Sequence, residues 1–211
     1  MKHTAIDRLL IEFNQGLNTL FGRPQTTERE NPAQQQSNQE LSAVESRHAA
    51  GLMRVNHSGE VAAQALYQGQ ALTAKLPEVR ESMERAALEE NDHLAWCESR
   101  LKDLGSHKSL LNPLWYTASF TLGALAGLAG DKWSLGFVAE TEHQVVRHLD
   151  SHLKSMPAAD EKSRSVLEQM REDETHHATA ALEAGGIPLP SPVTKAMGLV
   201  SKIMTKTSYR I

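Results

Sequence analysis

Two short segments of this chain place a glutamate and a histidine three residues apart, in the pattern Glu-x-x-His. They are Glu90–His93 and Glu174–His177. On a helix, side chains at this spacing lie on the same face, so each pair could present a carboxylate and an imidazole to one ion. A mixture of carboxylate and imidazole ligands suits iron. The first prediction from the sequence is therefore an iron site built on helices.

The pattern alone is weak evidence, because it also occurs at Glu45/His48 and Glu140/His143 in a chain with ten histidines. Position on the helix face separates the four matches. Glu140 shares its face with polar residues (Gln144, Arg147 and Ser151), which is typical of a solvated surface. Glu45 and His48 have no counterpart in the second half of the chain. We therefore expect neither of these two pairs to bind metal.

The carboxylates that remain each interrupt an apolar stripe. The stripes are Met53, Ala63 and Tyr67 around Glu60; Met83, Ala87, Leu94 and Cys97 around Glu90; Val138, Val145 and Leu149 around Glu142; and Leu167, Met170 and Ala181 around Glu174 and His177. A buried carboxylate is costly unless it is paired or bound to a cation. Four of them at one level would repel one another strongly, and two divalent iron ions would offset that charge.

The spacing along the chain predicts that these residues meet. Glu60 and Glu90 are 30 residues apart, Glu142 and Glu174 are 32 apart, and a turn near residue 76 or 158 lies midway in each case. Each hairpin therefore brings a lone glutamate level with a Glu-x-x-His pair. This is the arrangement of ferritin-like di-iron bundles. The predicted ligands of two iron ions, and the predicted catalytic residues, are Glu60, Glu90, His93, Glu142, Glu174 and His177.

The elements that must position these ligands are all helical, since no window alternates with period two for long enough to indicate a strand. Helices are expected over residues 41–76, from Pro77 to Leu104, and over 131–155 and 160–184. We predict an all-α, ferritin-like four-helix bundle in a domain of residues 41–211. Residues 1–40 are expected to form an amphipathic helix over 4–21, which either packs on the bundle or lies on a membrane. A flexible linker should follow, because 22–40 is polar and low in hydrophobicity.

Two further segments carry a membrane signal. Residues 109–130 contain no charge and are long enough to span a bilayer, but their small residues make a weak spanning helix. A buried crossover between the hairpins is one interpretation, and we favour a crossover with a partly exposed apolar face that touches lipid. Residues 184–211 contain no acid and form a basic amphipathic helix, which suits either an anionic membrane surface or docking on the bundle.

Several other residues have possible roles near the metal. Glu89 and Asp173 lie four residues before His93 and His177, and carboxylates often accept the free N–H of a metal-bound histidine. Tyr67 lies on the face of Glu60, where it is either a core residue or a hydrogen-bonding partner near the site. Structural roles are expected for three others, His148, His152 and Cys97.

Composition narrows the function classes. The 211 residues carry a net charge of −4, which gives no sign of a nucleic-acid partner. The single cysteine excludes an internal disulfide framework and fits a reducing compartment. Two alternatives to an iron enzyme remain open at this stage. One is an iron-storage or peroxide-handling bundle with the same ligands, and the other is a membrane scaffold without metal.

The chain resembles a known family over about residues 47–205. The matching segments are Arg54–Glu60, Tyr67–Gln70, Glu90–Leu94, Asn112–Trp115, Glu142 with His148, and Glu174–His177. They are similar to the motifs of the demethoxyubiquinone hydroxylase family. Asn56 departs from that pattern, in which an acid is usual, so any role next to the ligands is in doubt at that position.

The resemblance implies a di-iron monooxygenase of ubiquinone biosynthesis. Its substrates would be O2 and a prenylated quinol, 2-polyprenyl-3-methyl-6-methoxy-1,4-benzoquinol, and its electrons would come from a separate donor or from the quinol itself. Other ubiquinone-biosynthesis proteins are possible partners. Because a prenyl tail resides in lipid, we expect a peripheral protein on the cytoplasmic side of the cell membrane.

Overall fold

The computed structural model describes residues 5–23, 25–37 and 40–211, and within them every regular element is a helix. The elements in order are α1 (Ala5–Phe21), the short 3-10 helix η1 (Pro32–Gln35), α2 (Ala43–Thr73), α3 (Pro77–Asp103), α4 (Asn112–Ala129), α5 (Asp131–Ser155), α6 (Glu161–Glu183) and α7 (Ser191–Ser208). The predicted all-α class is confirmed. The parts of the predicted N-terminal region at residues 1–4, 24 and 38–39 lie outside the described residues.

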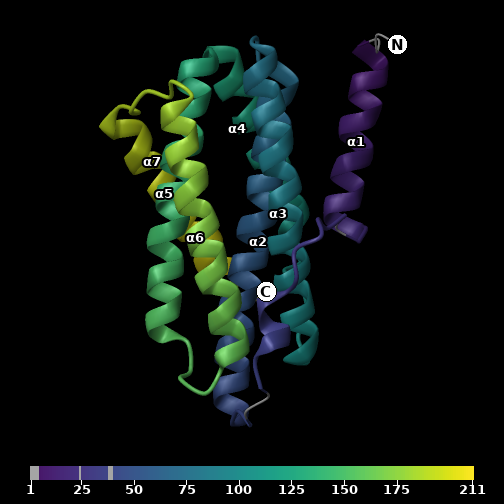
Figure 1. Ribbon diagram of the computed structural model, residues 1–211, viewed down its shortest axis with the longest axis vertical. Helices are drawn as coiled ribbons and strands as arrows, with labels where there is room; N and C mark the ends of the chain where they lie inside the picture. Colours follow the sequence, from purple (N-terminus) through teal and green to yellow (C-terminus); the bar gives the residue numbers. More distant parts are fainter. Residues whose placement is uncertain (1–4, 24, 38–39) are drawn as a thin grey trace.

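Helices α2 and α3 form one hairpin and α5 and α6 a second, and the two hairpins pack together as the predicted four-helix bundle (Figure 1). Local sequence explains where these helices begin and end. Ser42 and Glu45 form a reciprocal capping box at the start of α2. Pro77 occupies the first turn of α3, where its missing N–H costs little. Gly105, with φ of 64°, follows the end of α3 and adopts the left-handed conformation that favours glycine.

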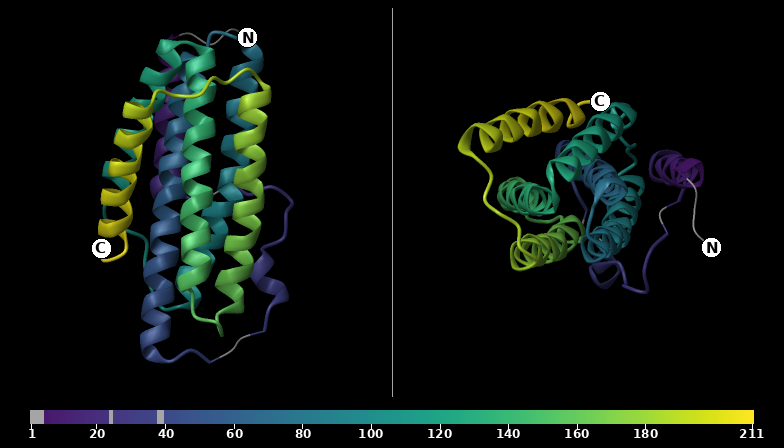
Figure 2. Two further views of the ribbon diagram at one scale, coloured as in Figure 1. Left: turned by 90° about the vertical axis from the view of Figure 1, so that its left-hand side faces the viewer. Right: turned by 90° about the horizontal axis from the view of Figure 1, so that it is seen from above.

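Helix α4 connects the hairpins by running along α2 (Figure 2). Glycines permit this close approach, since a Cβ on Gly123 would lie 2.2 Å from the carbonyl oxygen of Leu66. The outer side of α4 is apolar and exposed at Leu114, Leu122, Leu125 and Leu128. The predicted crossover is confirmed. Within the described ranges, no helix combines the length and apolarity needed to cross a membrane.

Two apolar clusters fill the bundle on either side of one polar level. One includes Met53, Cys97, Leu149 and Met170. The other includes Tyr67, Met83, Leu135, Val138 and Ala181. On each of the four bundle helices, the predicted ligands lie in the sequence between the members of these two clusters. The fold therefore encloses the polar level between two packed layers, and Cys97 has the core position that was expected.

The C-terminal helix packs on the bundle. Helix α7 contacts α2 and α5. Directly after the helix in the sequence, the Tyr209 hydroxyl lies 2.7 Å from Nδ1 of His48. An apolar face of α7 stays exposed at Leu199, Val200 and Ile203. Both features of the C-terminal prediction, docking and an exposed apolar face, are thus present together.

The part around η1 of the expected linker, residues 22–40, makes specific contacts with the bundle. Ala33 is buried in the core cluster of Met53 and Met170, and η1 contacts α6 and α3. The backbone N–H and hydroxyl of Thr27 donate to the buried Asp92 at 2.7 and 2.6 Å. The polar composition of this segment gives no sign of these contacts, because the acid that Thr27 binds lies far away in the sequence.

Candidate metal centre

The four bundle helices bring all six predicted ligands to one level. Helix α2 supplies Glu60, α3 supplies Glu90 and His93, α5 supplies Glu142, and α6 supplies Glu174 and His177. Glu90 and His93 are fully buried, and the others are at most slightly exposed, with the His177 side chain 10% accessible. The hairpin register that was inferred from spacing therefore places these side chains together.

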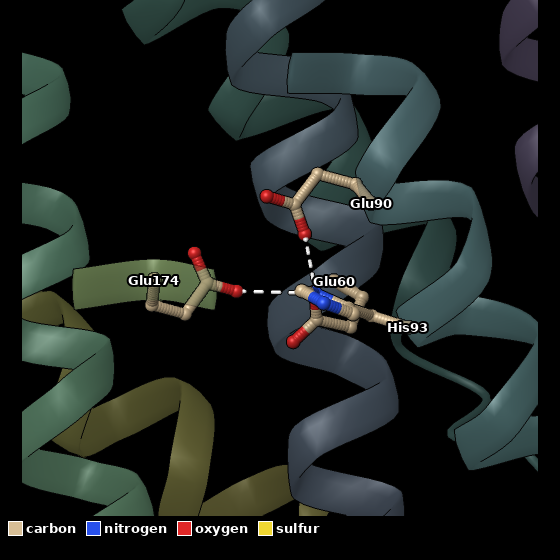
Figure 3. A group of neighbouring side chains, drawn as sticks. All are labelled: Glu60, Glu90, His93 and Glu174. Carbon is tan, nitrogen blue, oxygen red and sulfur yellow. Dashed lines mark hydrogen bonds and ion pairs between the residues drawn. The ribbon is translucent and has the colours of Figure 1, made fainter. Parts of the chain in front are cut away.

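Two of the carboxylates stand between the two histidines. His93 Nδ1 lies 3.1 Å from Oε2 of Glu90 and 3.2 Å from Oε1 of Glu174 (Figure 3). His177 Nδ1 lies 3.3 Å from the other oxygen of Glu90 and 3.2 Å from the other oxygen of Glu174. Glu60 Oε2 lies 3.4 Å from His93 Nδ1. Glu90 and Glu174 each therefore direct one oxygen toward each histidine, as carboxylates shared by two ions would.

Each histidine is oriented by a carboxylate on its outer nitrogen. His93 Nε2 lies 2.8 Å from Oδ2 of Asp173, and His177 Nε2 lies 2.6 Å from Oε2 of Glu89. The sequence identified both acids, but the pairs cross between α3 and α6 instead of joining residues four apart on one helix. A histidine that donates from Nε2 keeps Nδ1 as an acceptor, so both rings present a ligand atom to the same space.

Several buried carboxyl groups lie close together in this cluster, and both their burial and their mutual repulsion disfavour the charged form. Burial, then repulsion from Glu90, holds the pKa of Glu60 well above its usual range, and burial, then repulsion from Glu174, does the same for Glu142. Burial alone would lower the pKa of His177, but hydrogen bonds to Glu174 and Glu90 outweigh it and raise that pKa to about 12. Protons therefore balance the charge in the metal-free protein, and a divalent cation would displace them.

The unsatisfied atoms of this cluster fit a metal. The buried oxygens Oε2 of Glu60, Oε1 of Glu90 and Oε2 of Glu142 have no hydrogen-bond partner. Buried polar atoms are rarely left unpaired, so these three require a partner. Ligand atoms of Glu60, Glu90, His93 and Glu174 all lie within 4.8 Å of one another, as the ligands of one ion must. The cluster could therefore hold a metal ion.

Glu142 and His177 stand outside that group of four. The Tyr67 hydroxyl donates to Oε1 of Glu142 at 2.5 Å, and this bond leaves one carboxylate oxygen for other partners. Tyr67 is fully buried in the apolar cluster of α2, so it is both a core residue and a partner of the site. Of the two roles considered for Tyr67 in the sequence, the structure has both.

The histidines and acids that were set aside lie elsewhere. Glu140 accepts from Gln144 and pairs with Arg147 on the outside of α5, and Glu45 caps α2. His143 and His176 are exposed. Nδ1 of His152 lies 3.0 Å from Oδ1 of Asn56, the residue that departs from the family pattern.

Sequence reasoning missed Asp92 on α3 and the two residues outside the bundle that contact it, Thr27 and Arg29. Asp92 accepts from Thr27 and Arg29, and Arg29 also pairs with Asp173 at 2.9 Å. No periodicity marks Thr27 or Arg29, because they lie in an irregular segment. The one available signal was Asp92, an acid beside His93 inside a motif.

The fold and the site together define a class of protein, the helical bundle with a buried cluster of glutamates and histidines suited to metal. A model of the family described as ubiquinone biosynthesis protein COQ7 matches residues 47–208. The chain belongs to this family.

Similar proteins extend the match to nearly the whole chain. A 3-demethoxyubiquinol 3-hydroxylase of Nitrosococcus oceani is 60% identical over 99% of this chain and 97% of its own length. The protein of the same name from Acinetobacter baumannii is 61% identical over 99% of both chains. That of Pseudomonas fluorescens is 60% identical, over 99% of this chain and 97% of its own.

Proposed function

We propose that this chain hydroxylates the ring of 2-polyprenyl-3-methyl-6-methoxy-1,4-benzoquinol with O2, as a step of ubiquinone biosynthesis. The relatives named 3-demethoxyubiquinol 3-hydroxylase, which support this proposal, are about 60% identical to the chain over almost their entire length. The single observation that carries the proposal is the buried cluster of four glutamates and two histidines, in which three carboxylate oxygens have no hydrogen-bond partner.

The proposed cofactor is a pair of iron ions. His93 and Glu60 would hold one ion, His177 and Glu142 would hold the other, and Glu90 and Glu174 would bind both. The distances between the two Nδ1 atoms and the four oxygens of the shared carboxylates support this division. Iron, when bound, would supply the redox chemistry that reduces dioxygen.

The protein's own residues hold the ligands and shelter the site. Asp173 and Glu89 keep the Nε2 protons of the two histidines away from the site, and Tyr67 orients Glu142. The two apolar clusters exclude water from above and below. One oxygen atom of O2 enters the ring and the other leaves as water, and the two electrons this requires come from a donor or from the quinol itself.

A cavity beside the bundle offers the substrate a route toward the metal centre. It has a volume of about 570 Å³ and lies between α1 and the hairpin of α2 and α3, with Tyr67 in its wall. Its lining is mixed. Leu10, Ile11 and Met83 contribute apolar groups, while amide side chains such as Gln64 and Gln68 and other polar or charged residues make up the larger part. We propose that a substituted ring with a prenyl tail approaches the metal centre from this side.

We propose a peripheral position on the cytoplasmic face of the cell membrane, and the exposed apolar residues support its contact with lipid. They lie on α1 (Phe13, Leu17 and Phe21), α4 (Leu114, Leu122, Leu125 and Leu128) and α7 (Leu199, Val200 and Ile203). Flotation with vesicles that contain anionic lipid tests this position. Recovery of the protein entirely in the lipid-free fraction would contradict it.

The experiment that tests the function combines metal analysis with turnover. Protein loaded with ferrous iron should hold about two ions per chain and convert a short-chain prenylated methoxyquinol into its hydroxylated product with one atom from labelled O2. Product formation by protein stripped of metal would exclude the mechanism. Mineralisation of excess iron inside a multi-subunit shell, without ring hydroxylation, would favour the iron-storage alternative.

A further inference from the structure

The segment of residues 27–33, here called the N-terminal strap, lies across the outside of α3 and α6. Thr27 donates to both oxygens of Asp92, and Arg29 Nε donates to Oδ2 of the same residue at 2.9 Å. At the other end of the strap, Asn31 caps η1, and Ala33 is buried. The strap therefore contacts a buried group of the bundle, since Asp92 is fully inaccessible to solvent.

Arg29 connects the strap to the metal centre through one intermediate residue. Its Nη2 atom lies 2.9 Å from Oδ2 of Asp173, the same oxygen that faces Nε2 of His93 at 2.8 Å. Gln169 donates to the second oxygen of Asp173 at 3.0 Å. The guanidinium also lies over the ring of Trp96, 4.9 Å from its centroid, and that ring packs against His93 at 5.4 Å. Arg29 therefore contacts both groups that fix the plane of the His93 ring.

The corresponding position at the other histidine is built differently. Glu89, which faces His177, has a side chain that is 39% exposed, whereas that of Asp173 is 10% exposed. The imidazole of His177 is itself partly accessible, whereas that of His93 is not. The strap thus covers one histidine and its carboxylate and leaves the other pair at the surface.

We propose that Arg29 is a positioning residue, which through Asp173 and Trp96 holds His93 in its ligand orientation and makes the His93 metal position the tighter of the two. A guanidinium suits this task because its planar set of donors reaches two carboxylates at once. Partners that orient a ligand histidine contribute about 10- to 100-fold to metal affinity. The proposal rests on the metal centre of the proposed function.

Titration of the metal-free full-length protein with Co2+, followed by visible absorption, separates the two equivalents. A His93→Ala variant identifies which equivalent belongs to His93. In Arg29→Leu we expect that equivalent to bind at least about 10-fold more weakly, with the other unchanged. Arg29→Lys keeps the charge but cannot serve both carboxylates, so it should recover only part of the loss.

The matched control is Arg147→Leu, which removes the ion pair between Arg147 and Glu140 on α5. The nitrogen and oxygen of that pair lie 3.1 Å apart, close to the 2.9 Å between Arg29 and Asp173. This variant should leave both equivalents at wild-type affinity. Urea unfolding of each metal-free variant accompanies the titrations, because a purely structural role for Arg29 would lower stability and weaken both equivalents alike.

The outcomes separate this proposal from the proposed function. Equal weakening of both equivalents, or none, in Arg29→Leu would overturn the positioning role while leaving the two-metal centre intact. Full recovery with Arg29→Lys would overturn the bridging contact as its basis. A wild-type protein that binds no Co2+ or Fe2+ would overturn the proposed function itself.

Discussion

The two Glu-x-x-His halves of the site share a sequence pattern but not an environment. His93 is fully buried, faces Asp173 and is covered by the N-terminal strap, whereas His177 is slightly accessible and faces a half-exposed Glu89. Glu60 and Glu142 each keep one buried oxygen without a hydrogen-bond partner, and the other oxygen of Glu142 accepts from Tyr67. A repeated motif therefore builds two proposed metal positions that differ in burial and in access to water.

Removal of either histidine should have the largest effect. His93→Ala and His177→Ala should each abolish quinol hydroxylation while circular dichroism still reports the helical bundle, because each loses one proposed ligand but little of the apolar core. If the halves differ as described, His93→Ala should lose the tighter metal equivalent and His177→Ala the weaker. Retained turnover in either variant would remove that residue from the ligand set.

Replacing the carboxylates that face Nε2 of the two histidines should show most directly that the two halves of the site differ. Asp173→Asn should weaken metal binding at His93 by about 100-fold, and Glu89→Gln at His177 by about 10-fold, the two ends of the range for such partners. Water can replace the half-exposed Glu89, whereas the covered position of Asp173 offers it no such access. Equilibrium dialysis with Fe2+ under anaerobic conditions measures both, and equal losses would contradict the difference between the halves.

Metal binding should remove the pH dependence of stability that His177 gives the metal-free protein. Because the pKa of His177 is raised to about 12 in the folded protein, its stabilisation is complete below the unfolded pKa of about 6.5 and declines as pH rises toward 12. The pKa of Asp173 is lowered to about 2, so its stabilisation is present above about 3.8 and lost as pH falls toward 2. The unfolding free energy of metal-free protein should thus fall from pH 7 to 9.

Metal-loaded protein should instead bind its ions more tightly over the same interval, because binding releases protons. Urea unfolding at several pH values measures both trends. The fall should be smaller in metal-free His177→Ala than in the wild type. An identical slope in the two proteins would show that His177 does not carry the dependence.

The smallest effect is expected from Tyr67→Phe, which keeps the ring in the core and removes the hydroxyl that donates to Glu142. The lost hydrogen bond should cost about 1 kcal/mol of stability. Metal affinity should change only at the His177 position, by a few-fold at most, and stepwise Co2+ titration would detect it. A change at the His93 position would show that Tyr67 couples the two halves.

Much of the site could be predicted because helical periodicity defines which residues share a face. Glu142 was chosen over Glu140 on that ground, and the structure places Glu142 in the buried cluster and Glu140 outside it, paired with Arg147. The crossed pairs of Glu89 with His177 and Asp173 with His93 could not be predicted. Spacing along one helix says nothing about which side chain of a neighbouring helix lies nearest.

The sequence by itself determined the helices, the two hairpins and the level at which the six proposed ligands meet, because helix rise and turn position depend on local residues. Only the tertiary structure decided that the halves are unequal. Residues 22–40 are too polar to signal order locally, yet Thr27 and Arg29 are held by Asp92 and Asp173 from distant helices. Contacts of that kind exist only once the bundle has formed and has buried the acids that bind the strap.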